Sequence, residues 1–172
     1  MEKKFSIEEL ICLHLLRFRY SDICSKDEQE LRKMITQSSV TLAKAKMIIE
    51  KQKEAGIDTI SYYAEDYPAP FTRIGTEAPT VIYLSGNKDL LYQKENSVAV
   101  IGARNADSIG CDIAYQLARK YALRGNIIVS GLALGCDAAA HQGCIDANGK
   151  TVAVVASGLN IVYPKVNTSL QQ

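Results

Sequence analysis

The sequence predicts an α/β fold in which a parallel sheet follows a small N-terminal helical segment. Three short apolar runs rich in β-branched residues, at 98–101, 127–129 and 151–155, are typical of buried strands. The first two runs each end in a glycine-containing turn that leads into a helical pattern. Strand, turn, helix and strand in this order make a βαβ unit, and such folds bind ligands at the turns that follow the strands.

The N-terminal third carries signals for three short amphipathic helices. A serine followed three residues later by a glutamate is a capping-box signal, and it precedes two of the apolar-periodic runs, as Ser6 with Glu9 and as Ser25 with Glu28. The first helix is expected over residues 7–18. A third is expected over residues 40–55, with Gly56 just beyond its end. Three such helices predict a small bundle.

A connector of mixed pattern joins the helices to the α/β part. Residues 57–63 and 80–84 alternate enough to form short strands. Between them, Tyr-Pro-Ala-Pro at 67–70 predicts extended backbone, because proline lacks an N–H and biases the preceding residue away from helix. Phe71 and Ile74 are expected to pack on the α/β part.

Length and composition fit one ordinary domain with a helical appendage. The chain has 172 residues, of which 47% are hydrophobic and 23% charged. We expect the boundary near Asp66, with a helical segment at 1–66 and an α/β domain at 67–172. The formal net charge is +1, so no overall attraction to nucleic acid or membrane follows, and any anion site must be local.

The sequence favours a cytoplasmic protein with no membrane partner. The N-terminus lacks the apolar core of a signal peptide, and no run reaches the roughly 18 apolar residues of a membrane span. The five cysteines are odd in number and form no CxxC pair. Reduced thiols are therefore expected rather than a disulfide framework.

The first helix of the α/β part is expected over residues 108–124. Its large apolar residues are expected on the buried face, and alanines between them allow close approach to the sheet; the large residues are Ile109, Ile113, Leu117 and Tyr121, and the alanines are Ala114, Ala118 and Ala122. The next helix passes through His141 and Ile145 and ends near Gly149.

Two turns at the same edge of the predicted sheet suit an anionic ligand. N–H groups at a helix start carry partial positive charge and attract phosphate or carboxylate. Glycines at 102, 131 and 135 let backbone approach a ligand, Arg104 offers a planar fork for two phosphate oxygens, and Ser130 offers a hydroxyl. Neither GxGxxG nor GxxxxGK[ST] is present, which argues against dinucleotides and nucleoside triphosphates.

Asp137 and His141 stand one turn apart on the second helix. Together with Cys136 and Cys144 they lack the spacing of a zinc site, and Ser130 is the one nucleophile nearby. We expect supporting roles instead: Asp137 caps N–H groups, and His141 hydrogen-bonds loop backbone. No catalytic constellation emerges, so the sequence favours binding without turnover, and no cofactor is expected.

From about Ala43 to Leu170 the chain resembles the DNA processing protein A family, DprA or Smf. The resemblance depends on an ordered series of short motifs: Tyr67-Pro68, Gly86-Asn87 after a strand, VIGARNADSIG at 100–110, SGLALGCDAAAH at 130–141, Gly149-Lys150-Thr151, Gly158-Leu159, Tyr163-Pro164 and Asn167. Two positions depart from the family pattern: Ala103 stands where a serine is usual, and Cys136 where an isoleucine is usual.

The resemblance implies a Rossmann-like domain that binds single-stranded DNA, protects incoming strands in natural transformation and helps to load RecA recombinase. It assigns the phosphate pocket to two turns and one further cation: Gly102, Ala103, Arg104, Ser130, Gly131, Leu132, Gly135 and Lys165.

Family members continue beyond the position of Gln172, so the Rossmann-like sheet is incomplete relative to the family. The surfaces that the resemblance assigns to dimerisation and RecA contact lie largely in that further part. A sheet this short leaves apolar edge and face exposed, so we expect a homo-oligomer or a partner. Two alternatives stay open: a Rossmann protein that binds nucleotides or processes nucleoside monophosphates, and a fragment with no autonomous function.

Overall fold

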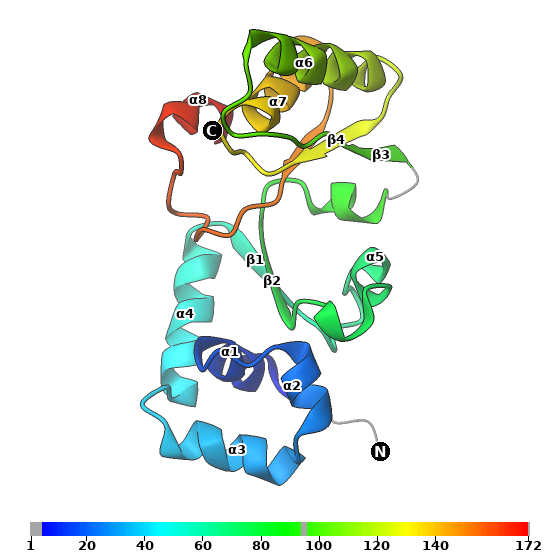
Figure 1. Cartoon of the computed structure of the whole chain (residues 1–172). Helices are drawn as coiled ribbons and strands as arrows, with labels where there is room; N and C mark the ends of the chain where they lie inside the picture. The colour runs from blue at the N-terminus through cyan, green and yellow to red at the C-terminus, as the bar shows by residue number, and fades with distance from the viewer. Residues whose placement is uncertain (1–4, 94–95, 172) are drawn as a thin grey trace. The chain divides into compact units, whose positions relative to one another are not determined.

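A computed structural model of the chain describes residues 5–93 and 96–171. It divides into two compact units, 1–88 and 89–172 (Figure 1). The expected boundary near Asp66 thus falls inside the first unit.

In its described residues the first unit begins with four helices: α1 (Ile7–Leu15), α2 (Tyr20–Ser25), α3 (Glu28–Gln37) and α4 (Leu42–Glu54). Their core is apolar and almost fully buried; it includes Leu10, Ile11, Leu13, Ile23, Leu31 and Ala45. The Ser6–Glu9 capping box forms as expected, and Gly56 follows α4 with a φ of 70°. The signal at Ser25 is wrong, because Ser25 ends the unforeseen α2 and the side chain of Asp27 caps α3.

An antiparallel pair of strands completes the first unit. Strand β1 (Ile57–Ser61) pairs with β2 (Val81–Ser85), and Val81 joins the helical core. This pairing explains why the first unit extends past Asp66. The segment between the strands contains the short helices α5 (Ala69–Thr72) and η1 (Gly75–Glu77).

The extended backbone expected at 67–70 is therefore only half correct. Pro68 is extended, but Pro70 is the second residue of α5, where a missing N–H removes no helical hydrogen bond. The Tyr67 ring contacts Phe71, and its hydroxyl donates to the Pro79 carbonyl at 2.7 Å. The expected packing of Ile74 is wrong, since its side chain is 53% exposed.

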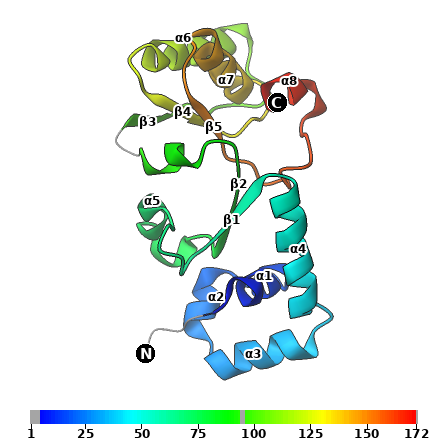
Figure 2. The same ribbon diagram turned by 180° about the vertical axis from the view of Figure 1, so that it is seen from behind.

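The second unit is a three-stranded parallel sheet in the order β3-β4-β5, with two long helices packed together (Figure 2). Ile128 of β4 pairs with Val98 of β3 and with Thr151 of β5. The bounds are η2 (Lys88–Tyr92), β3 (Ser97–Ala99), α6 (Ser108–Ala122), β4 (Ile127–Ser130), α7 (Cys136–Asp146), β5 (Thr151–Ala153), η4 (Lys165–Asn167) and α8 (Thr168–Gln171). The predicted parallel βαβ architecture is confirmed.

Helix α6 turns its alanines inward. Ala114, Ala118 and Ala122 are buried, and the last two join a core with Ile128, Ala140 and Cys144. Ile109, Ile113 and Leu117 are 68%, 54% and 43% exposed, so the expected burial of these three residues is wrong. The cause is close helix packing: a Cβ at Gly143 of α7 would lie 2.3 Å from the Tyr115 carbonyl oxygen of α6, which leaves room only for small side chains.

Apolar side chains are also exposed just beyond the carboxyl ends of two strands. Ile101, after β3, is 74% exposed, and Val154, after β5, is 61% exposed. Within the described residues, no helix is both long and apolar enough to cross a bilayer.

Candidate functional site

The loops that follow β3 and β4 meet at the carboxyl edge of the sheet. The backbone N–H of Cys136, the first residue of α7, donates to the carbonyl oxygen of Ala103 at 3.2 Å. Both loops follow parallel neighbouring strands, so their proximity is a consequence of the topology. The expectation that the two turns lie together is confirmed.

Three glycines in these loops are required by protein contacts. A Cβ at Gly135, which has a φ of 72°, would lie 2.3 Å from the Ala103 carbonyl oxygen. A Cβ at Gly102 would lie 2.6 Å from the Cys136 sulfur, and one at Gly131 would lie 2.7 Å from an Asp137 carboxylate oxygen. The sequence predicts that these glycines let the backbone approach a ligand. In the structure, their lack of a side chain instead lets the two loops contact each other.

Asp137 joins both loops through its carboxylate. Its Oδ1 accepts from the Gly102 N–H at 3.3 Å and its Oδ2 accepts from the Ala133 N–H at 3.4 Å. The side chain is 7% exposed. Asp137 therefore caps N–H groups of two loops rather than those of its own helix.

Backbone N–H groups at the N-terminus of α7 already donate to acceptors within the protein. Besides the Cys136 N–H, the Ala138 N–H donates to the Ala133 carbonyl at 3.1 Å. These donors were expected to be available to an anion. Because they are already paired, the positive character of this edge depends more on side chains.

Ser130 is 2% exposed, and its hydroxyl donates to the Val100 carbonyl at 2.7 Å. The bond joins the ends of β4 and β3. The sequence predicts that this hydroxyl is available to phosphate. In the structure it points into the protein instead, where it supports the loops.

The loop after β4 is held in place from the C-terminal segment. Leu132 is buried, with a φ of 59° that a leucine seldom adopts. The Asn167 side chain donates to the Leu132 carbonyl at 2.9 Å and to the Ala133 carbonyl at 3.2 Å. Asn167 is itself 6% exposed, so its amide is a buried clamp on this strained turn.

His141 is 1% exposed and contacts a side chain, not the loop backbone that was expected. Its Nδ1 lies 2.7 Å from the Thr151 hydroxyl, which donates to the Ile128 carbonyl. That hydroxyl proton is thus committed, so Nδ1 carries the proton and Nε2 is a buried acceptor with no partner among the described residues. Burial lowers the pKa of His141, and the charge of Asp137 opposes this effect.

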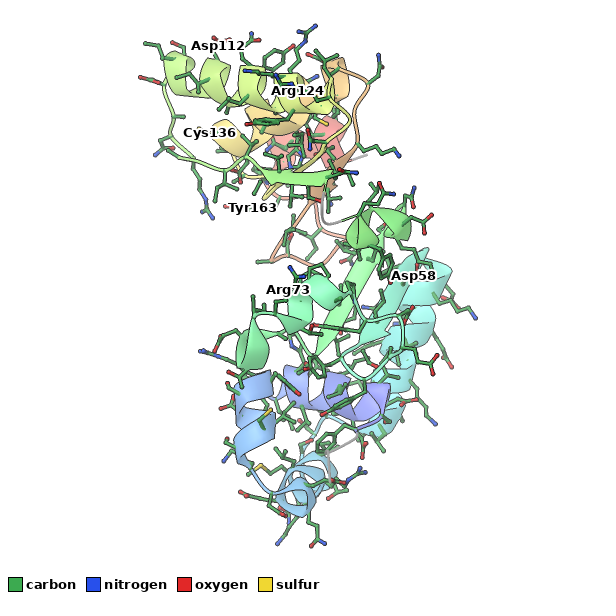
Figure 3. The ribbon with its side chains drawn as sticks, turned by 90° about the vertical axis from the view of Figure 1, so that its right-hand side faces the viewer. Asp58, Arg73, Asp112, Arg124, Cys136 and Tyr163 are labelled. Atoms are coloured by element: carbon green, nitrogen blue, oxygen red, sulfur yellow. The ribbon has the colours of Figure 1, made fainter. Side chains whose placement is uncertain are left out.

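An open cleft of about 190 Å³ lies over the joined loops. It is lined by Arg104, Gly131, Ala133, Leu134, Val155, Ala156, Ser157, Tyr163 and Pro164. Arg104 is exposed and is the one charged residue among these. Tyr163, 67% exposed, lies on the segment between β5 and η4 (Figure 3).

The candidate residues from the sequence separate into two groups in space. Arg104 and Gly131 line the cleft, and Lys165 is exposed directly after Pro164 of its rim. Gly102, Ser130, Leu132, Gly135, Asp137 and His141 build or support the loops, and Ala103 supplies the carbonyl that joins them.

Sequence reasoning missed one contributor to this site, because it gave Asn167 no role. The Tyr163-Pro164 pair is typical of a turn in which the tyrosine ring offers a face for stacking, and Tyr163 does line the cleft. The usable signal for Asn167 was an amide side chain four positions after this tyrosine, on the segment after β5. No group of three potential metal ligands occurs within residues 5–93 and 96–171.

Comparisons with known proteins agree on one family. The family model described as DNA recombination-mediator protein A matches residues 58–172. DNA processing protein DprA of Bacillus subtilis is 32% identical over 123 residues, which cover 72% of this chain and 41% of that protein. DprA of Streptococcus pneumoniae is 40% identical over 106 residues, which cover 61% of this chain and 36% of that protein.

Solved structures give the same result. The X-ray structure of DprA from Streptococcus pneumoniae aligns with 96% of this chain and 58% of its own, at a TM-score of 0.62 and 26% identity. DNA processing protein A from Helicobacter pylori, whose structure concerns its single-stranded DNA binding mode, aligns with 66% of this chain and 49% of its own, at a TM-score of 0.55 and 30% identity. The chain spans less than half the length of the two DprA relatives from Bacillus and Streptococcus. It belongs to the DNA recombination-mediator protein A family, whose members include the DprA and Smf proteins.

Proposed function

We propose that this chain binds single-stranded DNA at the cleft over the β3 and β4 loops, without catalytic turnover. Support comes from the binding described for the Helicobacter pylori relative and from the position of Arg104. That position is the observation that carries the proposal: an exposed guanidinium stands in a cleft whose other lining residues are uncharged.

The chemistry of the cleft suits a strand backbone. A guanidinium binds two phosphate oxygens at once, and such a contact positions a strand without reading its sequence. Lys165 adds an exposed cation next to the rim. We therefore propose that Arg104 is the principal phosphate contact and Lys165 a second one, while the glycines hold the loops together.

The shape of the cleft favours a strand over an enclosed nucleotide. Its volume of about 190 Å³ is below the roughly 300 Å³ at which small-molecule pockets begin. The exposed ring of Tyr163 supplies a face on which an unpaired base can stack, and a duplex does not offer such a base. This argues against a site that processes nucleoside monophosphates.

The wider role follows from the family resemblance. We propose that the strand-bound protein protects single strands during natural transformation and passes them to RecA. Purified RecA mixed with labelled single strands, with and without this chain, tests that role; faster growth of RecA filaments is expected, and an unchanged rate would restrict the chain to binding.

A salt titration tests the proposed DNA contact. Labelled single-stranded and duplex DNA are titrated with the full chain at two salt concentrations, and the slope of log K against log salt is measured. Each phosphate contact contributes about −0.7 to that slope for single strands. Arg104→Ala should weaken binding to every sequence and flatten the slope by about one contact.

Arg124→Ala is the matched control. Arg124 follows the end of α6, and α6 leads from the carboxyl edge of β3 to the amino end of β4, so Arg124 lies at the opposite edge of the sheet from Arg104. The control should keep both affinity and slope. Equal effects of the two substitutions, or none from Arg104→Ala, would contradict the proposed site.

A further inference from the structure

The turn between α1 and α2 carries two arginines that the cleft does not use. We call residues 16–19 the α1–α2 turn. With the first residue of α2, it contains the sequence Arg17-Phe18-Arg19-Tyr20, in which cations alternate with aromatic residues. Phe18 packs on the helical core, whereas Arg17 and Arg19 are exposed. Because two residues span at most about 7 Å of chain, both guanidinium groups can reach the same stretch of a bound polyanion.

Arg17 adopts a backbone conformation that suits glycine. Its φ is 70°, in the left-handed region that is sterically unfavourable for a residue with a Cβ. It follows Leu16, the C-cap of α1, and so stands where helices usually place a glycine. The Arg17 N–H donates to the His14 carbonyl at 2.9 Å, and the Phe18 N–H donates to the Leu13 carbonyl at 3.0 Å. A glycine would make the same turn without strain, which points to a role for the arginine side chain.

Arg19 is held in place by the start of α2. Its backbone N–H donates to the Asp22 carboxylate at 2.8 Å. The next residue, Tyr20, packs its ring against Tyr62, with the ring centroids 4.1 Å apart. Both arginines therefore stand on backbone that the protein already fixes. A ligand would have to order only their side chains, which keeps the entropic cost of binding small.

Neither guanidinium is neutralised by the part of the chain that the structure describes. There Arg17 and Arg19 form no ion pair, in contrast to Arg32, which pairs with both Glu9 and Glu28. A guanidinium is weakly hydrated and matches the geometry of phosphate oxygens. Two exposed, unpaired arginines on fixed backbone therefore favour a ligand with repeated phosphates.

We propose that the α1–α2 turn binds the phosphate backbone of a second stretch of single-stranded DNA through Arg17 and Arg19. The choice of this polyanion rests on the proposed function, and cations beside aromatic residues are typical of surfaces that bind single strands. The turn belongs to the first unit and the cleft to the second, and no residue of the turn lines the cleft. The two sites can therefore be altered independently.

A purely structural role for Arg17 makes a different prediction. Cations near the C-terminus of a helix are favoured by its dipole, so the loss of such a role should lower stability. Arg17→Gly removes the charge but also relieves the unfavourable φ. We expect a melting temperature equal to or above that of the wild type, together with weaker DNA binding. A lower melting temperature with unchanged binding would overturn the proposal.

A salt titration of the full chain with labelled single-stranded DNA measures the contacts. Arg17→Gly combined with Arg19→Ala should weaken binding at low salt roughly tenfold and flatten the slope of log K against log salt by about 1.4, the value of two contacts. Lys33→Ala combined with Lys46→Ala is the matched control, because it removes the same charge from exposed positions of α3 and α4. The control should keep the wild-type slope.

Counting short strands separates this inference from the proposed function. With a labelled oligothymidylate of about six nucleotides, the wild type should bind two strands per chain. The double arginine variant and Arg104→Ala should each bind one. If Arg104→Ala still bound two strands and the double variant one, the cleft would be contradicted and the turn supported. One strand per wild-type chain, a double variant equal to its lysine control, or equal displacement by a polyglutamate peptide would overturn the inference.

Discussion

Gly135 and Ala103 touch across the two loops of the site. A Cβ at Gly135 would stand 2.3 Å from the Ala103 carbonyl oxygen, and the next residue, Cys136, donates its N–H to that same oxygen. The position of Arg104, which follows Ala103 directly, therefore depends on a residue without a side chain at the start of α7. Backbone contacts therefore hold the loop that carries Arg104, the proposed phosphate contact.

Gly135→Ala should lower the free energy of unfolding by about 3 kcal/mol, because the new methyl group clashes with backbone and the φ of 72° strains any other residue. Gly125→Ala is the control. Gly125 has a φ of 83°, but a Cβ there meets nothing within 4 Å, so strain alone should cost about 1 kcal/mol. Urea unfolding measures both, and equal costs would show that the loop contact is not tight.

Asn167 should prove essential to the loop after β4. Asn167→Ala removes one buried and one part-buried hydrogen bond to backbone carbonyls and should cost about 1–3 kcal/mol of stability. Asn167→Asp should be worse, because it sets a carboxylate against the same carbonyl oxygens. Single-strand affinity should fall in both variants. If Asn167→Asp matched the wild type in thermal stability, the clamp would be disproved.

His141 should make the stability of the second unit depend on pH. Burial lowers the pKa of His141 below its ordinary 6.5, so the unfolded state binds the proton more readily than the folded state. The contribution of the neutral ring is thus complete above about pH 6.5 and is lost as pH falls toward the lower folded pKa, by at most about 1.4 kcal/mol per pH unit.

Thermal melts between about pH 5 and pH 8, the range over which histidine side chains change charge, measure this dependence. His141→Gln should flatten the fall on the acid side, even though it lowers stability at neutral pH. The chain has one other histidine, His14, which is exposed in the first unit. His14→Gln should keep the wild-type profile; a flattened profile in this control would assign the pH effect elsewhere.

How far the sequence predicts this molecule depends on which interactions are local. The capping box at Ser6 and the strand–turn–helix rhythm are local, and they led to the correct fold class. Which side of α6 faces inward does not depend on local sequence, because the helix has both an aliphatic side and an alanine side at helical spacing. The choice depends on Gly143, a residue of another helix.

The same division applies to the site. Arg104 and the glycine turns could be found from sequence, because turns after parallel strands are common binding positions. The inward hydroxyl of Ser130 and the clamp from Asn167 could not, since both depend on partners about thirty or more positions away. The short α2 was also hidden, because six residues carry too little periodicity to stand out.

Tyr163 should contribute to single-strand affinity by stacking and not by charge. Tyr163→Ala removes an exposed ring from the cleft and should weaken binding by about 1–3 kcal/mol, the usual value of one stacked base. Because a ring releases no counterions, the salt slope should remain that of the wild type, unlike in Arg104→Ala. Tyr163→Phe keeps the ring and should bind as the wild type does. A weaker Tyr163→Phe would indicate that the hydroxyl makes the contact, and a flattened slope in Tyr163→Ala would contradict stacking.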